Sequence, residues 1–264
     1  MLKNINDRFK SHNKELLSDA SLLFTKSLAK HKFNLITTIY VISIFLALFL
    51  IIFTDFDLKL QNYFYDFYHK EWLIDKDEKA KKLLFYNLPK IILAILIFII
   101  LILTIYFYYQ KQFYKYLQSL LLLIGVVTNL LFVANIKKFT NIRCPNQIID
   151  FNGNFIYNKV FDPDFSRYNK KGQCFPAGHA VTAFCLMMTY YIFNQKFIKI
   201  MLLIISVISG WIIGIYQIAK GAHFFGDTLI SMLLCGLVAN LVAKYFILFY
   251  LKKNIKICTI FTPK

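Results

Sequence analysis

The chain alternates between long apolar runs and short segments that hold nearly all of its charged residues. Four of the apolar runs are about 19–21 residues long and contain no charged residue. As a helix, each would be about 30 Å long, which is the thickness of the hydrocarbon core of a bilayer. These runs, which predict membrane-spanning helices, are Phe33–Phe53, Ile91–Tyr109, Tyr116–Ile136 and Ile200–Ala219.

Two further apolar runs complete the pattern. Ala177–Phe193 is shorter and contains one histidine. Thr228–Leu251 contains a single charged residue, Lys244, whose amine can extend toward the bilayer surface. We therefore predict an all-α, polytopic membrane protein with six transmembrane helices in one bundle, residues 33–251. The composition agrees, since 58% of the residues are hydrophobic, against about 45–50% in soluble domains.

The two flanking segments are basic. Residues 1–32 carry lysines between apolar residues that recur at helical spacing from Leu16 to Leu28. This pattern fits an interfacial helix on anionic lipid as well as it fits a solvated basic terminus. Residues 252–264 form a short basic tail.

The distribution of charge predicts the orientation. The net charge is +17, and its bases flank the spans instead of forming a stripe with exposed aromatic residues, so nucleic acid is not an expected partner. Four basic segments fall on one side if the spans alternate, and we assign them to the cytoplasm. They are residues 1–32, 110–115, 194–199 and 252–264. The expected location is the inner (cytoplasmic) membrane of a bacterium.

The loops 54–90, 137–176 and 220–227 then face the periplasm. The first contains Leu58–Trp72, a segment crowded with aromatic residues. It predicts a helix in the outer interface, where Tyr and Trp anchor proteins to the bilayer, with substrate binding as the alternative.

Three short segments on this predicted outer side combine residues that can perform chemistry. They are Lys137–Pro145 (KKFTNIRCP), Pro176–His179 (PAGH) and Lys220–Asp227 (KGAHFFGD). The histidines outside them, His12, His31 and His69, have no such neighbours and are expected to have no catalytic role.

The segment Pro176–His179 is typical of a helix start, because proline suits the first turn. The free N–H groups of Ala177, Gly178 and His179 would then point at an anion together with the positive end of the helix dipole. Gly178 would let a ligand approach the backbone, and the His179 side chain could donate a proton to it.

In the third segment His223 and Asp227 are four residues apart, so on a helix they would lie on one face. The carboxylate would fix the tautomer of the imidazole and raise its nucleophilicity. Lys220 would add a cation to the same face. Further positive charge comes from Lys137, Lys138 and Arg143. Together these groups predict a site for in-line phosphoryl transfer.

These three segments resemble the motifs of the type 2 phosphatidic acid phosphatase superfamily, K-x6-R-P, P-S-G-H and S-R-x5-H-x3-D. Lys137 and Pro145 stand at the spacing of the first motif, PAGH matches the second, and His223 and Asp227 match the third. The resemblance implies that His223 forms a phosphohistidine that Asp227 orients. It also implies that His179 protonates the leaving oxygen and that Lys137 binds the phosphate.

The chain departs from these motifs at several positions. Cys144 replaces the arginine of the first motif, with Arg143 one residue early, and Ala177 replaces serine. Tyr216-Gln217 replaces Ser-Arg, and the nearest cation is Lys220. A subgroup of bacterial membrane members has a similar pattern, with Cys-Pro, C-F-P-A-G-H and Gln-x2-Arg-Gly-Ala-His-Phe. We therefore expect Arg143, Lys220, Gly178 and Ala177 to bind phosphate beside Lys137.

The resemblance implies a lipid phosphatase acting on a phosphorylated membrane lipid within the bilayer. The candidate substrates are lipid A phosphate, undecaprenyl pyrophosphate and phosphatidylglycerol phosphate, and the basic loop 137–176 slightly favours lipid A. The alternatives are a lipid phosphotransferase that uses the same phosphohistidine, and a non-catalytic transporter or channel. No cluster has the spacing of metal ligands, so we expect neither a metal nor another cofactor. The oligomeric state is not predicted.

Two of the five cysteines, Cys144 and Cys174, fall in the loop assigned to the periplasm, where disulfides persist. A bond between them would pin the first motif against the second. We therefore predict a disulfide, with two free thiols as the alternative.

Overall fold

The computed structural model describes residues 31–75, 79–140, 142–159 and 172–260, with the side chains of 251–260 left out. The N-terminal segment, for which the sequence leaves two interpretations open, falls outside the described residues, apart from His31 and Lys32.

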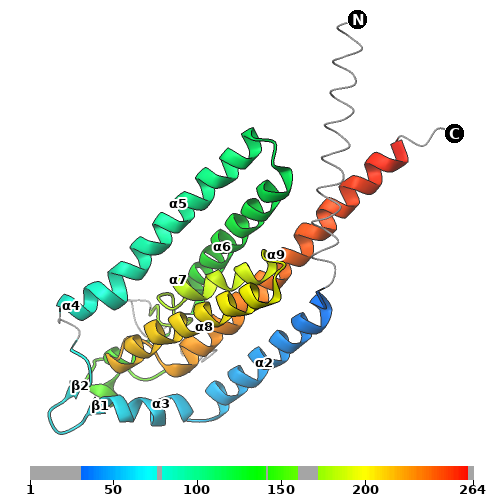
Figure 1. Ribbon diagram of the computed structural model, residues 1–264. Helices are drawn as coiled ribbons and strands as arrows, with labels where there is room; N and C mark the ends of the chain where they lie inside the picture. The colour runs from blue at the N-terminus through cyan, green and yellow to red at the C-terminus, as the bar shows by residue number, and fades with distance from the viewer. Residues whose placement is uncertain (1–30, 76–78, 141, 160–171, 261–264) are drawn as a thin grey trace, which may run out of the picture.

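Within this part, five helices are long and apolar enough to cross a membrane (Figure 1). They are α2 (Phe33–Phe53), α5 (Leu88–Tyr109), α6 (Phe113–Thr140), α8 (Lys196–Ala219) and α9 (Phe225–Ile260). The short helix α4 (Lys79–Lys82) and one stretch of π-helix, η2 (Leu83–Asn87), precede α5 and are continuous with it. The prediction of an all-α polytopic membrane protein is confirmed.

The fourth predicted span, Ala177–Phe193, is shorter than the sequence suggests. It consists of α7 (Val181–Phe184) followed by η5 (Cys185–Tyr191), a 3₁₀ helix. A 3₁₀ helix rises about 2.0 Å per residue, against about 1.5 Å in an α-helix, so fewer residues cover the same depth. The segment nevertheless reaches the far end of the bundle. There, Gln118 Nε2 in the second turn of α6 donates a hydrogen bond to the carbonyl of Ile192 (2.7 Å).

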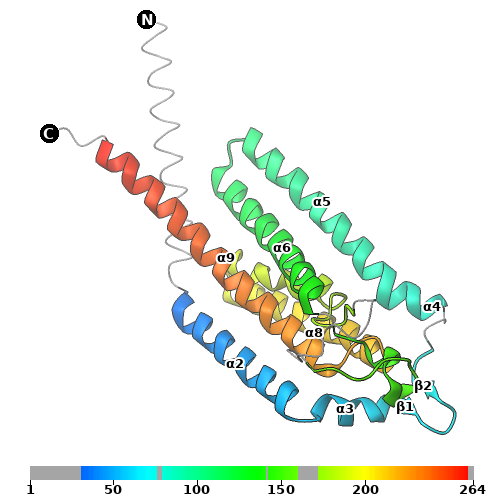
Figure 2. The same cartoon turned by 180° about the vertical axis from the view of Figure 1, so that it is seen from behind.

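The last helix is the centre of the bundle. α9 packs against α2, α6, α7, η5 and α8, whereas α5 packs mainly on α6 (Figures 1 and 2). Close packing at η5 depends on glycine: a Cβ on Gly125 would lie 2.4 Å from Met188 Sδ. Small residues at such crossings are typical of membrane helices, whose association relies on close van der Waals contact.

The aromatic segment after α2 does not form the single helix predicted over Leu58–Trp72. It contains α3 (Phe56–Gln61), a 3₁₀ turn η1 (Asn62–Phe64) and an antiparallel hairpin of β1 (Tyr65–Asp66) and β2 (Glu71–Trp72). The helix prediction is therefore wrong beyond Phe64. The reason is local, since Asp66 Oδ1 accepts the N–H groups of Tyr68 (2.8 Å) and His69 (3.2 Å) and closes a turn instead.

The hairpin packs at the same end of the bundle as the loop after α6, in which η3 (Pro145–Gln147) and η4 (Ile149–Phe151) are single 3₁₀ turns (Figure 1). The ring of Trp72 lies 4.9 Å from that of Tyr65 and 5.3 Å from that of Phe151. These aromatic side chains thus pack on one another and cover the end of the bundle where the three motifs meet.

Candidate active site

The three motifs come together at one end of the bundle and are joined in pairs. Asn146 N–H, after the first motif, donates to the carbonyl of Gly221 in the third (2.8 Å). Ala177 N–H in the second donates to the carbonyl of Asp227 in the third (3.1 Å). A disulfide joins Cys144 to Cys174, with 5.1 Å between their Cα atoms. Segments far apart in sequence are therefore held in one arrangement.

The His223–Asp227 pair forms although it does not lie on one helix. His223 precedes α9, and Asp227 is in its first turn, where its Oδ2 lies 3.3 Å from His223 Nδ1. The same oxygen accepts the N–H of Phe224 (3.0 Å), which orients the carboxylate. With Nδ1–H donating to Asp227, the lone pair remains on Nε2, the atom that can attack phosphorus.

The environment of His223 keeps the ring neutral. Its side chain is 3% exposed. Burial lowers the pKa of His223 well below its usual value, and the charges of Lys137 and Lys220 lower it further. A neutral imidazole is the form that acts as a nucleophile.

Lys137 lies beside the second motif. It is in the last turn of α6, and its Nζ would be 3.5 Å from a Cβ on Gly178, with no backbone atom in between. A glycine at that position therefore leaves room for a ligand next to the amine. This is the place at which the resemblance puts the phosphate.

The second motif differs from the predicted helix start. α7 begins only at Val181, because residues 177–180 form a turn that the Ala177–Asp227 bond holds against α9. The expectation that the Ala177 N–H binds phosphate is thus wrong, since this donor is used. In the described part of the chain, the N–H groups of Gly178 and His179 have no hydrogen-bond partner.

His179 faces both His223 and a group that the sequence did not suggest. Its ring centroid is 5.8 Å from that of His223 and 4.5 Å from that of Tyr86 in η2. Lys90, in the first turn of α5, holds its Nζ 3.7 Å from the Tyr86 ring. Burial lowers the pKa of His179 to about 2, with further contributions from His223 and three lysines. These lysines are Lys90, Lys137 and Lys220.

The spacing predicted that Lys220 would share a helical face with His223, and this prediction is wrong. α8 ends at Ala219, and Gly221 adopts a left-handed conformation (φ 71°) that reverses the chain. The Lys220 amine instead lies over the rings of Tyr86 (5.1 Å) and Tyr216 (4.9 Å). It still contributes positive charge near His223.

Arg143 is buried, and its guanidinium carbon lies 3.9 Å from the centroid of the Phe155 ring. It is not among the charges that lower the pKa of His179 or His223. A role in binding phosphate remains a prediction for this residue.

Gln217, where the family motif has arginine, is fully buried in the last turns of α8. Within the described residues neither atom of its amide has a hydrogen-bond partner. A buried amide without partners is costly, so an oxygen of a bound ligand or water would stabilise it.

Asp57 in α3 supports the start of α9. Its Oδ1 accepts the N–H of Gly226 (2.9 Å), and a neighbouring residue, Gln61, donates through Nε2 to the carbonyl of Ile218 (2.9 Å). Both side chains are buried. The aromatic segment thus positions the loop that carries His223. Nothing in the local sequence distinguishes Asp57 from the nearby Asp55, so the sequence alone did not suggest this role.

Replacing Asp57 by asparagine should change how stability depends on pH. Burial, and next the nearby Asp227 carboxylate, raise the pKa of Asp57 to about 7, above the unfolded value of about 3.9. Between these values only the folded state holds the proton, so the free energy of unfolding rises as pH falls from about 7 to about 4. Asparagine keeps the acceptor for Gly226 without the charge. If Asp57→Asn is as stable as wild type at pH 5, it should therefore be about 2–3 kcal/mol more stable at pH 8.

The measurement is thermal unfolding in detergent at the two pH values. Asp66→Asn is the control, because this exposed carboxylate bonds to His69 (2.6 Å), and that bond lowers the pKa of Asp66. It should give no gain at pH 8. A variant Asp57→Asn that is less stable than wild type at pH 8 would contradict this account.

The Cys144–Cys174 disulfide leads to a prediction about stability and cysteine reactivity. Cys174 Sγ lies 3.4 Å from Nδ1 of His223, so the bond is directly beside this histidine. It closes a loop of 30 residues and should stabilise the fold by about 3–4 kcal/mol on the chain-entropy account. In unfolded, unreduced protein, mass spectrometry should find Cys185 and Cys235 alkylated, and Cys144 and Cys174 alkylated only after reduction.

The double variant Cys144→Ser/Cys174→Ser should unfold at a lower temperature, whereas Cys185→Ser serves as a control that leaves the bond intact. Alkylation of Cys144 and Cys174 without reductant would show that the bond is absent.

Comparison with known proteins agrees with this geometry. No curated protein and no solved structure matches the chain significantly. The sequence profile of the PAP2 superfamily matches residues 114–250, which include all three motifs and more than half of the chain. With its motifs assembled around His179 and His223, the chain belongs to the PAP2 superfamily.

Proposed function

We propose that the protein hydrolyses a phosphate monoester or pyrophosphate on a membrane lipid, without a metal, through a phosphohistidine on His223. Membership of the PAP2 superfamily supports an activity of the phosphatase or phosphotransferase type on phosphate esters. The observation that carries the finer proposal is the buried, neutral His223, oriented by Asp227 and flanked by Lys137.

In the first step, the lone pair of His223 Nε2 attacks phosphorus while the bond to the lipid oxygen breaks. Lys137, with the N–H groups of Gly178 and His179, binds the phosphate oxygens on which negative charge is held. Asp227 stabilises the positive charge that develops on the imidazole. In the second step, water attacks the phosphohistidine, the P–N bond breaks, and inorganic phosphate leaves.

His179 supplies the proton to the leaving oxygen in the first step and accepts one from water in the second. In the empty site its pKa is low, partly because of the neighbouring lysines. A phosphate dianion offsets these positive charges, so its binding should raise the pKa of His179. The proton donor is thus formed when substrate is present.

The proposed location is the inner membrane of a bacterium, with the site on the periplasmic side. Support comes from the charges: the described loops at the opposite end carry lysines and no acids, as at 110–115 and 194–199. Topology reporters fused after Lys111 and after Asn154 should therefore report opposite sides, with the first cytoplasmic. Identical signals from the two fusions would contradict the topology.

Purified protein in detergent, assayed for free phosphate on a panel of lipids, tests the function. Lipid A, undecaprenyl pyrophosphate and phosphatidylglycerol phosphate are the first candidates, with lipid A favoured by the basic loop after α6. Release of phosphate in the absence of an acceptor lipid separates hydrolysis from transfer. EDTA should leave the rate unchanged, and inhibition that added metal reverses would refute the proposed mechanism.

A further inference from the structure

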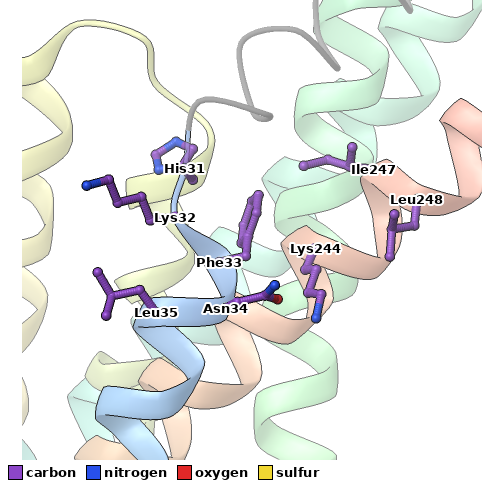
Figure 3. Close-up of a pocket in the computed structure, with 8 residues that line it drawn as sticks. All are labelled: His31, Lys32, Phe33, Asn34, Leu35, Lys244, Ile247 and Leu248. Atoms are coloured by element: carbon purple, nitrogen blue, oxygen red, sulfur yellow. The ribbon is translucent and has the colours of Figure 1, made fainter.

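At the end of the bundle opposite the site, a cavity of about 510 Å³ lies between α2 and α9. Figure 3 shows residues 31–35 at the start of α2 on one side and Lys244, Ile247 and Leu248 of α9 on the other. None of these residues takes part in the proposed reaction, which occurs at the far ends of both helices.

Hydrogen bonds hold the two helices that form the walls of the cavity. Asn240, one turn before Lys244, is fully buried and donates through Nδ2 to the carbonyl of Phe33 (3.1 Å) and to Thr37 Oγ1 (2.8 Å). Its Oδ1 accepts the hydroxyl of Tyr191 (2.9 Å). These bonds hold the start of α2 to α9, so the walls are formed before any ligand arrives.

Two lysines, Lys32 and Lys244, line the cavity, and among the described residues no acidic side chain pairs with them. Every acidic residue of the described part is in the loops and helix ends at the catalytic end of the bundle: Asp55, Asp57, Asp66, Glu71, Asp75, Asp150 and Asp227. A lysine near the end of a span extends its amine toward the headgroup region, where an anionic group can pair with it, and the described residues provide no such group.

The surroundings indicate what kind of anion this is. Leu35 and Leu248 line the cavity and are 53% and 49% exposed on the outside of the bundle, where lipid tails lie. A ligand with a charged head and apolar chains would therefore place the head near Lys32 and Lys244 and its chains along α2 and α9. Basic pockets between membrane helices bind the heads of anionic lipids in this way.

We propose that this cavity binds the phosphate of an anionic phospholipid from the leaflet opposite the catalytic one. The lipid is a ligand and not a substrate, because α2 and α9 separate it from His223 by the depth of the membrane. Its binding stabilises the α2–α9 pair.

The test uses full-length protein in a neutral detergent, with phosphatidylglycerol, phosphatidylcholine or inorganic phosphate added. Native mass spectrometry measures the retained lipid, and thermal unfolding measures stabilisation. Wild type should retain phosphatidylglycerol and gain stability from it. Lys32→Gln/Lys244→Gln should bind it about 10–30-fold more weakly, from about a fivefold loss for each charge near a headgroup, less some overlap.

Two controls separate a specific site from general charge. Lys196→Gln removes a lysine at the same end of the bundle but outside the cavity, and should bind as wild type does. Lys244→Arg keeps the charge and should retain the lipid. Phosphate release by the double variant should be unchanged. Failure of the lipid-binding proposal can therefore be distinguished from failure of the proposed function.

The proposal is overturned if the double variant retains phosphatidylglycerol as well as wild type does, or if wild type does not bind it. Equal stabilisation by phosphatidylcholine would also overturn it, because the lysines would then have no role. Equal stabilisation by inorganic phosphate alone would show that the site takes a free anion and not a lipid.

Discussion

Replacing His223 by alanine is expected to reduce phosphate release by about 10⁴-fold or more, because no bond to phosphorus can then form. His179, whose ring centroid is 5.8 Å away, has no carboxylate partner among the described residues and should not substitute for His223. The measurement is phosphate release with the best lipid from the panel, together with trapping of an acid-labile phosphoprotein that the variant should not form.

Two variants make this result specific. Asp227→Asn should retain more activity than His223→Ala, since the nucleophile is still present and only its tautomer and charge are affected. His69→Ala removes a histidine at the same end of the bundle that is exposed and bonded to Asp66 (2.6 Å). It should be as active as wild type. Phosphate release by His223→Ala within tenfold of wild type would rule out the phosphohistidine.

Replacing Lys137 by methionine should lower kcat/KM by about 10²–10³-fold, the usual effect of removing one preorganised group that binds developing charge. Methionine fills a similar volume, so the packing of the last turn of α6 should be kept. The effect should appear in kcat as well as in KM, because the charge on the phosphate oxygens is held through the transition state.

Lys138→Met is the matched control. Lys138 is the next residue on α6 but is exposed, and it is not among the charges that act on either histidine of the site. Its replacement should change kcat/KM less than about threefold. If both lysines gave the same loss, the effect would be one of general surface charge and not of a phosphate site.

The spans and the motifs were predictable from sequence because each leaves a local signal. A charge-free run of about 20 residues has few alternatives to a membrane helix, and α2, α5, α6 and α8 coincide with such runs. The helix α9 coincides with the apolar run that contains only Lys244. The fourth span was predicted too long, because hydrophobicity does not reveal that Cys185–Tyr191 winds as a 3₁₀ helix. Met188 of this segment packs against Gly125, which only the fold brings near.

The site residues that could not be predicted from the sequence leave no such local signal. Tyr86 and Lys90 look like ordinary residues at the start of a span, and Asp57 like one acid in a polar loop. They reach the site only because η2, the start of α5 and α3 lie beside the loop that carries His223. The Ala177 amide was misjudged for a similar reason: whether a donor is free depends on a carbonyl 50 residues away.

The proposed catalytic groups lie at helix ends. This position determines whether the bulk or the surface concentration of substrate sets the rate. Lys90 lies in the first turn of α5, Lys137 lies in the last turn of α6, and His179 precedes α7, so the proposed phosphate site is at the height of the lipid headgroups. For an enzyme built in this way, substrate arrives by lateral diffusion in two dimensions. Its rate should follow the mole fraction of substrate in the micelle or bilayer surface. Adding inert detergent at a constant bulk amount of substrate should therefore slow turnover by surface dilution.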